Sequence, residues 1–113
     1  MPREMPFAVD VVELPDLVLV RVAGDLDVAT APELARALTE CEGRYCELDL
    51  LQVTFADSSA LNLLTKYQRH TTARGGTLRL VDASVPVRRV LDITGTAKLF
   101  FASPDEPRDP PEK

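Results

Sequence analysis

The chain has 113 residues, of which 45% are hydrophobic and 5% aromatic, so it fits one domain with a mainly aliphatic core. Its net charge of −5 argues against direct nucleic-acid binding, because such proteins need a basic surface to replace counterions at phosphates. The sequence has neither a run of about 18 apolar residues nor the apolar stretch of a secretory signal. We therefore expect a cytoplasmic protein that does not insert into membranes.

Two β-branched, apolar segments open the chain, at residues 7–13 and 17–22. Leu14, Pro15 and Asp16 separate them, a pattern typical of a hairpin of two strands. Gly24 is expected to end the second strand.

A helix is expected next, because Thr30 and Glu33 have the spacing of a capping box. In such a box the threonine hydroxyl bonds the N3 amide, and the glutamate carboxylate bonds the amide of the cap. Gly43 is expected to end this helix, and a short strand should span residues 46–50.

Cys41 and Cys46 lie between this helix and the start of that strand. Two cysteines are too few for a disulfide framework, and their spacing matches no common zinc or redox motif. We therefore expect reduced thiols, the usual state in a cytosolic protein, with a regulatory or disulfide role as the lesser alternative.

Asp57, Ser58 and Ser59 lie where a strand-like run gives way to apolar residues at helical spacing, which predicts a helix from about 58 to 72. Aspartate and serine favour helix N-caps because their oxygens accept hydrogen bonds from first-turn amides. The same amides and the helix dipole would tolerate a phosphate on a hydroxyl placed there. Ser58 is therefore the candidate switch residue, with Ser59 as the runner-up acceptor.

The remaining elements alternate in type. A strand is expected at 77–81, then a helix capped by Ser84 with Pro86 in its first turn, and a last short strand at 99–101. The alternation predicts an α/β fold: a mixed sheet of four to five strands with three to four helices on one face or both.

The composition changes near the end of the chain, where prolines and charges replace apolar residues. We therefore expect a single domain at residues 1–102 and a disordered, proline-rich acidic tail at 103–113.

A serine hydrolase is a rival interpretation. However, the only histidine, His70, lies twelve positions after Ser58 on the predicted helix, about 18 Å away, whereas a general base must act within about 3.2 Å or through one water. Asp57 would be a poor base for its neighbour.

A metal site is a second alternative. Asp25 and Asp27 offer two carboxylates without a third ligand, and hard cations prefer six or more oxygens. We expect no enzyme activity, no metal site and no cofactor.

Residues 50–61, LLQVTFADSSAL, resemble the signature of the STAS domain, and specifically that of the bacterial anti-sigma factor antagonists. Three further segments agree in order and spacing: AGDLD at 23–27, RGGTLRL at 74–80 and VRRVLDITG at 87–95. Together the four segments extend the resemblance over roughly residues 7–101.

The resemblance implies a STAS-like single domain that binds an anti-sigma factor in its unphosphorylated form and thereby releases a sigma factor. In these antagonists the partner is itself a kinase, and it phosphorylates the serine directly after the motif aspartate, which is Ser58 here. A separate serine phosphatase would restore the hydroxyl. The expected partner surface comprises Asp25, Asp27, Asp57, Ser58, Ser59, Ala60 and Asn62.

Three positions depart from the family pattern, and two of them, Ala60 and Asn62, lie close to the serines, whereas the third, Thr96, follows the third helix. Ala60 stands where glycine is usual, and Asn62 stands where a small residue is common. The methyl of Ala60, beside the acceptor, could exclude a partner whose backbone packs closely there. The alternative function is a STAS interaction module that is not phosphorylated, such as a small subunit of a lipid-transport ATPase.

Overall fold

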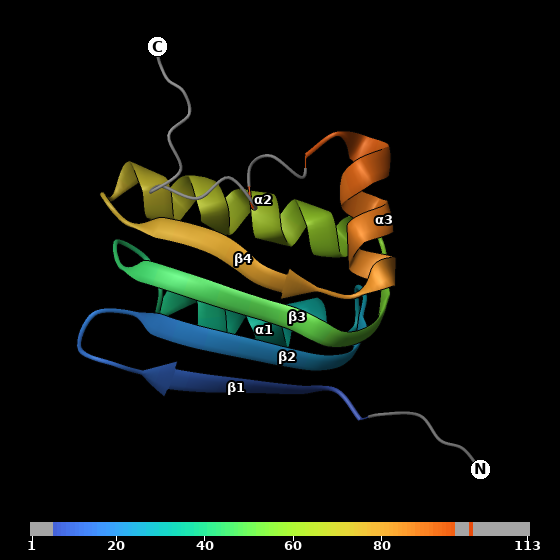
Figure 1. The fold of residues 1–113 in the computed structure, drawn as a ribbon, viewed down its shortest axis with the longest axis horizontal. Coiled ribbons are helices and arrows are strands. Elements are labelled where there is room, and N and C mark those ends of the chain that lie inside the picture. Colours follow the sequence, from blue (N-terminus) through green and yellow to red (C-terminus); the bar gives the residue numbers. More distant parts are fainter. Residues whose placement is uncertain (1–5, 97–99, 101–113) are drawn as a thin grey trace.

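The structure, a computed structural model, describes residues 6–96 and Phe100. Its elements are β1 (Ala8–Glu13), β2 (Val18–Leu26), α1 (Ala31–Thr39), β3 (Tyr45–Ala56), α2 (Ser58–Ala73), β4 (Thr77–Ala83) and α3 (Val85–Thr94) (Figure 1). The predicted α/β fold is confirmed, with four strands and three helices in the described residues. No helix among these residues is long and apolar enough to cross a bilayer.

The four strands form one mixed sheet in the order β1-β2-β3-β4. β1 and β2 pair antiparallel, which confirms the predicted hairpin, while β2–β3 and β3–β4 pair parallel. The parallel connections β2-α1-β3 and β3-α2-β4 proceed in the same direction across the sheet, so α1 and α2 lie on the same face of it. The two helices touch there, with the hydroxyls of Thr39 and Tyr67 3.4 Å apart. α3 packs against α2 and β3 at the end of the sheet (Figure 1).

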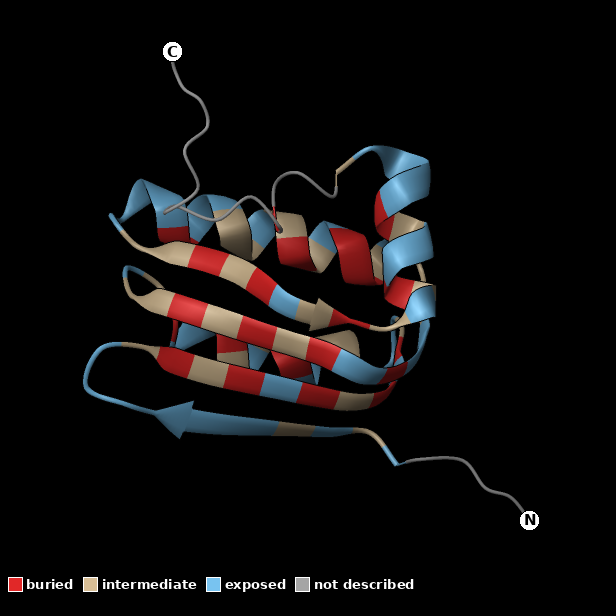
Figure 2. Ribbon diagram, viewed as in Figure 1, coloured by how far each residue is buried: buried red, intermediate tan, exposed pale blue. Residues whose placement is uncertain are grey.

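The core lies between the sheet and the helices, and it is formed by every second residue along the strands. Val18, Val20 and Val22 of β2 are at most 1% exposed, and buried residues alternate with less buried ones along this strand (Figure 2). Leu19 and Arg21, between them, therefore lie on the opposite face of the sheet. That opposite face carries ion pairs across neighbouring strands, such as Arg21 to Asp49 at 3.3 Å. The sheet is therefore apolar on the helix side and largely polar on the other.

Two strands are longer than the sequence predicts. β2 continues through Gly24 to Leu26, and β3 runs to Ala56 rather than ending at residue 50. Gly24 has a φ of +94°, and a Cβ there would lie 2.8 Å from the Cα of Phe7. Gly24 therefore allows the N-terminal segment to pass close to β2 instead of ending that strand.

The start of α1 also differs from the sequence-based prediction. Thr30 is the N-cap as expected, but its side chain makes no capping bond, so the predicted capping box with Glu33 is wrong. The Thr30 hydroxyl instead donates to the carbonyl oxygen of Asp25 at 2.8 Å and accepts from the amide of Asp27 at 3.0 Å. At its other end α1 stops at Thr39, before Gly43.

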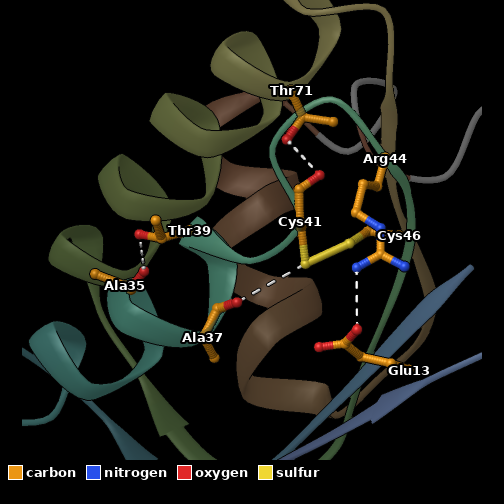
Figure 3. The surroundings of a disulfide bond; sticks show 8 residues. All are labelled: Glu13, Ala35, Ala37, Thr39, Cys41, Arg44, Cys46 and Thr71. Carbon is orange, nitrogen blue, oxygen red and sulfur yellow. Dashed lines mark hydrogen bonds and ion pairs between the residues drawn. A yellow bond between two sulfur atoms is a disulfide. The ribbon is translucent and has the colours of Figure 1, made fainter.

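Cys41 and Cys46 form a disulfide, so the expectation of two reduced thiols is wrong (Figure 3). The chain reverses between α1 and β3 and brings the two Cα atoms to 5.9 Å, a separation that suits a disulfide. Both residues lie in the core, at 1% and 0% exposure. The pairing follows from this turn, which the spacing of the cysteines alone did not reveal.

The end of the chain is only partly described. Ser84 is the N-cap of α3, as predicted, although its side chain makes no capping bond. The predicted strand at 99–101 falls outside the described residues except for Phe100, whose backbone is helical and whose side chain is fully buried. The predicted tail at 103–113 also lies outside them, so the boundary at residue 102 stays a prediction.

Candidate functional site

The predicted site residues gather at the carboxyl ends of β2 and β3, next to the N-terminus of α2. Leu26 pairs with Ala56 in the parallel register, so the segments that follow the two strands start side by side. The Thr54 hydroxyl donates to Asp25 Oδ1 at 2.7 Å and links the two strand ends. We refer to residues 25–28 and 54–59 as the acidic edge.

Asp57 caps α2, as the sequence predicts. The sequence leaves this capping role open beside a role in positioning the acceptor hydroxyl or contacting the partner. The Asp57 backbone is extended, and its Oδ1 accepts from the amides of Ser59 at 3.0 Å and Ala60 at 3.4 Å. The same oxygen accepts from the Ser59 hydroxyl at 2.6 Å. The Ser59 hydroxyl, helped by these amides, holds the pKa of the Asp57 carboxyl below its ordinary value. The carboxylate therefore places a fixed negative charge at the N-terminus of α2.

The two serines differ in what their hydroxyls do. Ser59 is half-buried, and its hydroxyl is engaged by Asp57. Ser58 is exposed, and its side chain makes no hydrogen bond to any other described residue. The Asp57 carboxylate thus contacts the hydroxyl of Ser59, whereas the hydroxyl of Ser58 is accessible from solvent.

Asp25 and Asp27 support the loops of the acidic edge. Asp27 Oδ1 accepts from the amides of Ala29 at 3.0 Å and Thr30 at 3.2 Å, so it orders the approach to α1. Asp25 is exposed, and its carboxylate accepts the bond from Thr54. In residues 6–96 and Phe100, His, Cys, Asp and Glu form no group of three or more that could hold a metal ion.

The two positions near the serines that depart from the family pattern lie in different surroundings. Ala60 is 2% exposed, and its methyl packs in the core, where it lines a small apolar gap with Leu26, Val87 and Leu91. Asn62 is exposed on α2. The Ala60 side chain is therefore part of the core and not of the surface beside the serines.

Two exposed apolar side chains at the acidic edge were missing from the predicted site. Val28 is 75% exposed and follows Asp27, while Phe55 is 47% exposed and pairs with Asp25 in the sheet. A signal for Val28 existed in the sequence, because it is an apolar residue in a loop between predicted elements. The exposure of Phe55 depends on the strand register, which the sequence did not reveal.

His70 lies on α2 with Ser58, as predicted, twelve positions further along and therefore about 18 Å away. Its Nδ1 faces Glu42 Oε2 at 3.7 Å. His70 is therefore too far from Ser58 to take its proton.

The STAS domain family matches residues 8–107. The anti-sigma-B factor antagonist of Bacillus subtilis strain 168 is 31% identical over 101 residues, which cover 88% of this chain and 93% of that protein.

Several solved structures share the fold. An anti-sigma factor antagonist from Mycobacterium paratuberculosis superposes with a TM-score of 0.74 and 25% identity, covering 88% of this chain and 89% of that one. A Bacillus cell fate determinant, solved in its phosphorylated form, superposes with a TM-score of 0.65 and 20% identity, covering 85% of this chain and 89% of that one. At this identity the second structure shows a likeness of fold alone. These matches confirm the resemblance that the four sequence motifs indicated.

Proposed function

The chain belongs to the STAS domain family, and from this premise we propose that it is an anti-sigma factor antagonist of the cytoplasm. In its unphosphorylated form it binds an anti-sigma factor, itself a serine kinase, so that a sigma factor is released to RNA polymerase. Phosphorylation of Ser58 ends the binding, and a serine phosphatase restores it. The observation that carries this proposal is the exposed, unengaged hydroxyl of Ser58 at the N-terminus of α2.

Ser58 is a better acceptor than Ser59 on two grounds. A kinase must bring the γ-phosphate of its nucleotide in line with the attacking oxygen, so the hydroxyl must be reachable. Ser58 is exposed, while Ser59 is half-buried and donates its proton to Asp57 at 2.6 Å. Phosphorylation of Ser59 would also remove that bond to the cap of α2. ATP and magnesium belong to the kinase partner.

The charge of the phosphate supplies the switch. A phosphoserine adds a charge of about −1.5 to −2, next to the Asp57 carboxylate, whose pKa is already lowered. The N-terminus of α2 would stabilise the phosphate by about 0.3–1 kcal/mol. Burial against a partner that offers no cationic receptor costs several kcal/mol, and about 1.4 kcal/mol is tenfold in affinity. The cost at the interface therefore exceeds the local gain.

The proposed contact surface is the acidic edge together with the exposed face of α2 that carries Asn62. Val28 and Phe55 supply exposed apolar area, as the centre of an interface requires, and Asp25, Asp27 and Asp57 supply polar groups around it. Ala60, whose methyl lies in the core, would meet a partner only through its backbone.

The acceptor assignment is tested by incubating the purified chain with candidate anti-sigma kinases and Mg-ATP, then mapping the phosphate by mass spectrometry. We expect phosphate on Ser58 in the wild type and in Ser59→Ala, and none in Ser58→Ala. Thr72→Ala, an exposed change at the far end of α2, is the matched control and should be phosphorylated like the wild type. Phosphate that persists in Ser58→Ala would contradict the assignment.

The regulatory role is tested by adding the chain to a preformed complex of sigma factor and anti-sigma factor. We expect free sigma factor to appear with the unmodified chain and not with the chain phosphorylated at Ser58. Failure to release sigma factor from any candidate complex, with stable binding to a lipid-transport ATPase instead, would favour the alternative of a STAS module that is not phosphorylated.

A further inference from the structure

We propose that Cys41 and Cys46 form a reversible redox site that exchanges with low-molecular-weight thiols and disulfides. This inference is independent of the proposed function, because the pair lies near the C-terminal end of α2, whereas Ser58 starts that helix. Both cysteines lie in the core, and a turn of four residues joins them (Figure 3).

The turn is held by bonds that do not depend on the disulfide. The Arg44 amide donates to the Cys41 carbonyl oxygen at 2.9 Å, and the Thr77 amide donates to the Arg44 carbonyl oxygen at 2.9 Å. The Thr71 hydroxyl of α2 reaches the Cys41 carbonyl oxygen at 3.5 Å. These contacts keep the two Cα atoms close after reduction, so that the disulfide can close again with little loss of chain entropy.

The reduced form also fits the core. Cys41 Sγ lies 3.9 Å from the Ala37 carbonyl oxygen, where a thiol can donate a weak hydrogen bond (Figure 3). Cysteine thiols are among the side chains most often found buried. Reduction therefore leaves two small apolar groups in the core, a burial that cysteine tolerates, and we expect the fold to persist in the reduced form.

The exchange can be written with oxidised glutathione as the probe. The thiolate of one cysteine attacks a glutathione sulfur, which breaks the glutathione disulfide, forms a mixed disulfide and releases one glutathione thiolate. The second cysteine thiolate then attacks the protein sulfur of the mixed disulfide and expels the other glutathione. Two protein thiols and one glutathione disulfide thus become one protein disulfide and two glutathione thiols.

Access to the buried sulfurs requires a local opening of the turn. Gly43 is exposed, and the only ion pair described between the turn and β1 joins Arg44 Nη1 to Glu13 Oε1 at 3.3 Å with both side chains well exposed. Such a surface pair resists opening weakly. Glu42 of the turn also lies 3.5 Å from Arg74 and 3.7 Å from His70, again through exposed side chains of the partners. Exchange therefore requires these surface pairs and the two backbone hydrogen bonds of Arg44 to break together in a local opening that falls short of global unfolding.

The test equilibrates the full chain, without denaturant, in buffers that vary the ratio of squared reduced glutathione to oxidised glutathione. Free thiols are then trapped with a maleimide and counted by intact mass. We expect molecules with either two labels or none, and the oxidised fraction should change from roughly one tenth to nine tenths over about a hundredfold change in that ratio. Far-UV circular dichroism should stay the same throughout. Cys46→Ser and Cys41→Ser, which leave one thiol each, should instead form a single glutathione adduct.

Three results would overturn the proposal. Two labels at every ratio would mean that the cysteines do not pair. No label at any ratio, with reduction only in denaturant, would mean a permanent structural link. Wild-type chain that accumulates glutathione adducts would mean that the second thiol does not resolve the first.

Discussion

Replacement of Asp57 by alanine should destabilise the fold by about 1–2 kcal/mol. The substitution removes the oxygen that accepts bonds from the Ser59 amide at 3.0 Å, the Ala60 amide at 3.4 Å and the Ser59 hydroxyl at 2.6 Å. Loss of an N-cap side chain typically costs about 1 kcal/mol, and up to about 2 kcal/mol. The favourable contact between carboxylate and helix dipole adds about 0.3–1 kcal/mol, which gives a total of about 1.3–2 kcal/mol.

Urea unfolding followed by circular dichroism measures this difference, with Ser58→Ala as the matched control. Ser58 is exposed and forms none of these bonds, so its substitution should change the unfolding free energy by no more than about 0.5 kcal/mol. An Asp57→Ala variant as stable as Ser58→Ala would refute the assignment of Asp57 as the cap.

The pH dependence gives a second check through Asp57→Asn, which keeps an acceptor oxygen and loses the charge. Because the pKa of Asp57 is lowered in the folded state, its ionised form stabilises the fold above the unfolded-state pKa of about 3.9. That stabilisation is lost as the pH falls through the lower folded-state pKa. The advantage of wild type over Asp57→Asn should therefore be constant from pH 7 to about pH 5 and shrink below it. A difference that stays constant down to pH 3 would contradict this reasoning.

Two further substitutions give clear expectations. Ser59→Ala removes the hydroxyl that lowers the pKa of Asp57, so that pKa should rise toward its ordinary value in a carboxyl NMR titration, and an unchanged pKa would contradict the hydrogen bond. Gly76→Ala should destabilise by about 3 kcal/mol, because a Cβ there would collide with the backbone of Arg44. Gly95→Ala should destabilise by only about 1–2 kcal/mol, because no atom lies near the added Cβ and the only cost is the strain of a φ of +72°. Equal losses for the two glycine variants in urea unfolding would count against the close approach at Gly76.

Sequence reasoning succeeded where the signal is local. The cap of α2 could be predicted because Asp57 bonds amides only two and three residues away. The hairpin followed from two β-branched runs with a short turn between them, and the third helix from its apolar spacing after Ser84. In each case the residues that carry the pattern are neighbours in the chain.

Sequence reasoning failed where pairing with a distant strand determines the local structure. Between the pairs Arg21–Asp49 and Ala23–Gln52, β3 advances three residues while β2 advances two, which is a β-bulge. The bulge breaks the alternation of burial in β3 and leaves Leu51 53% exposed, so the apolar–polar alternation of the sequence ends at residue 50 although the strand continues to Ala56. Local periodicity cannot show such an extra residue, because the partner strand defines it.

Two other errors have the same origin. Thr30 was expected to cap its own helix, but its hydroxyl bonds the backbone of the preceding loop, at Asp25 and Asp27. Cys41 and Cys46 meet because the chain reverses between α1 and β3. Both outcomes depend on loop geometry that the residue types alone leave open.

The most direct test of the account is the affinity of the chain for its anti-sigma factor, measured by isothermal titration calorimetry before and after stoichiometric phosphorylation of Ser58. We expect tight binding of the unmodified chain and binding at least about a hundredfold weaker after phosphorylation, because the added dianion would have to be buried beside the Asp57 carboxylate. Equal affinity of the two forms would contradict the charge switch.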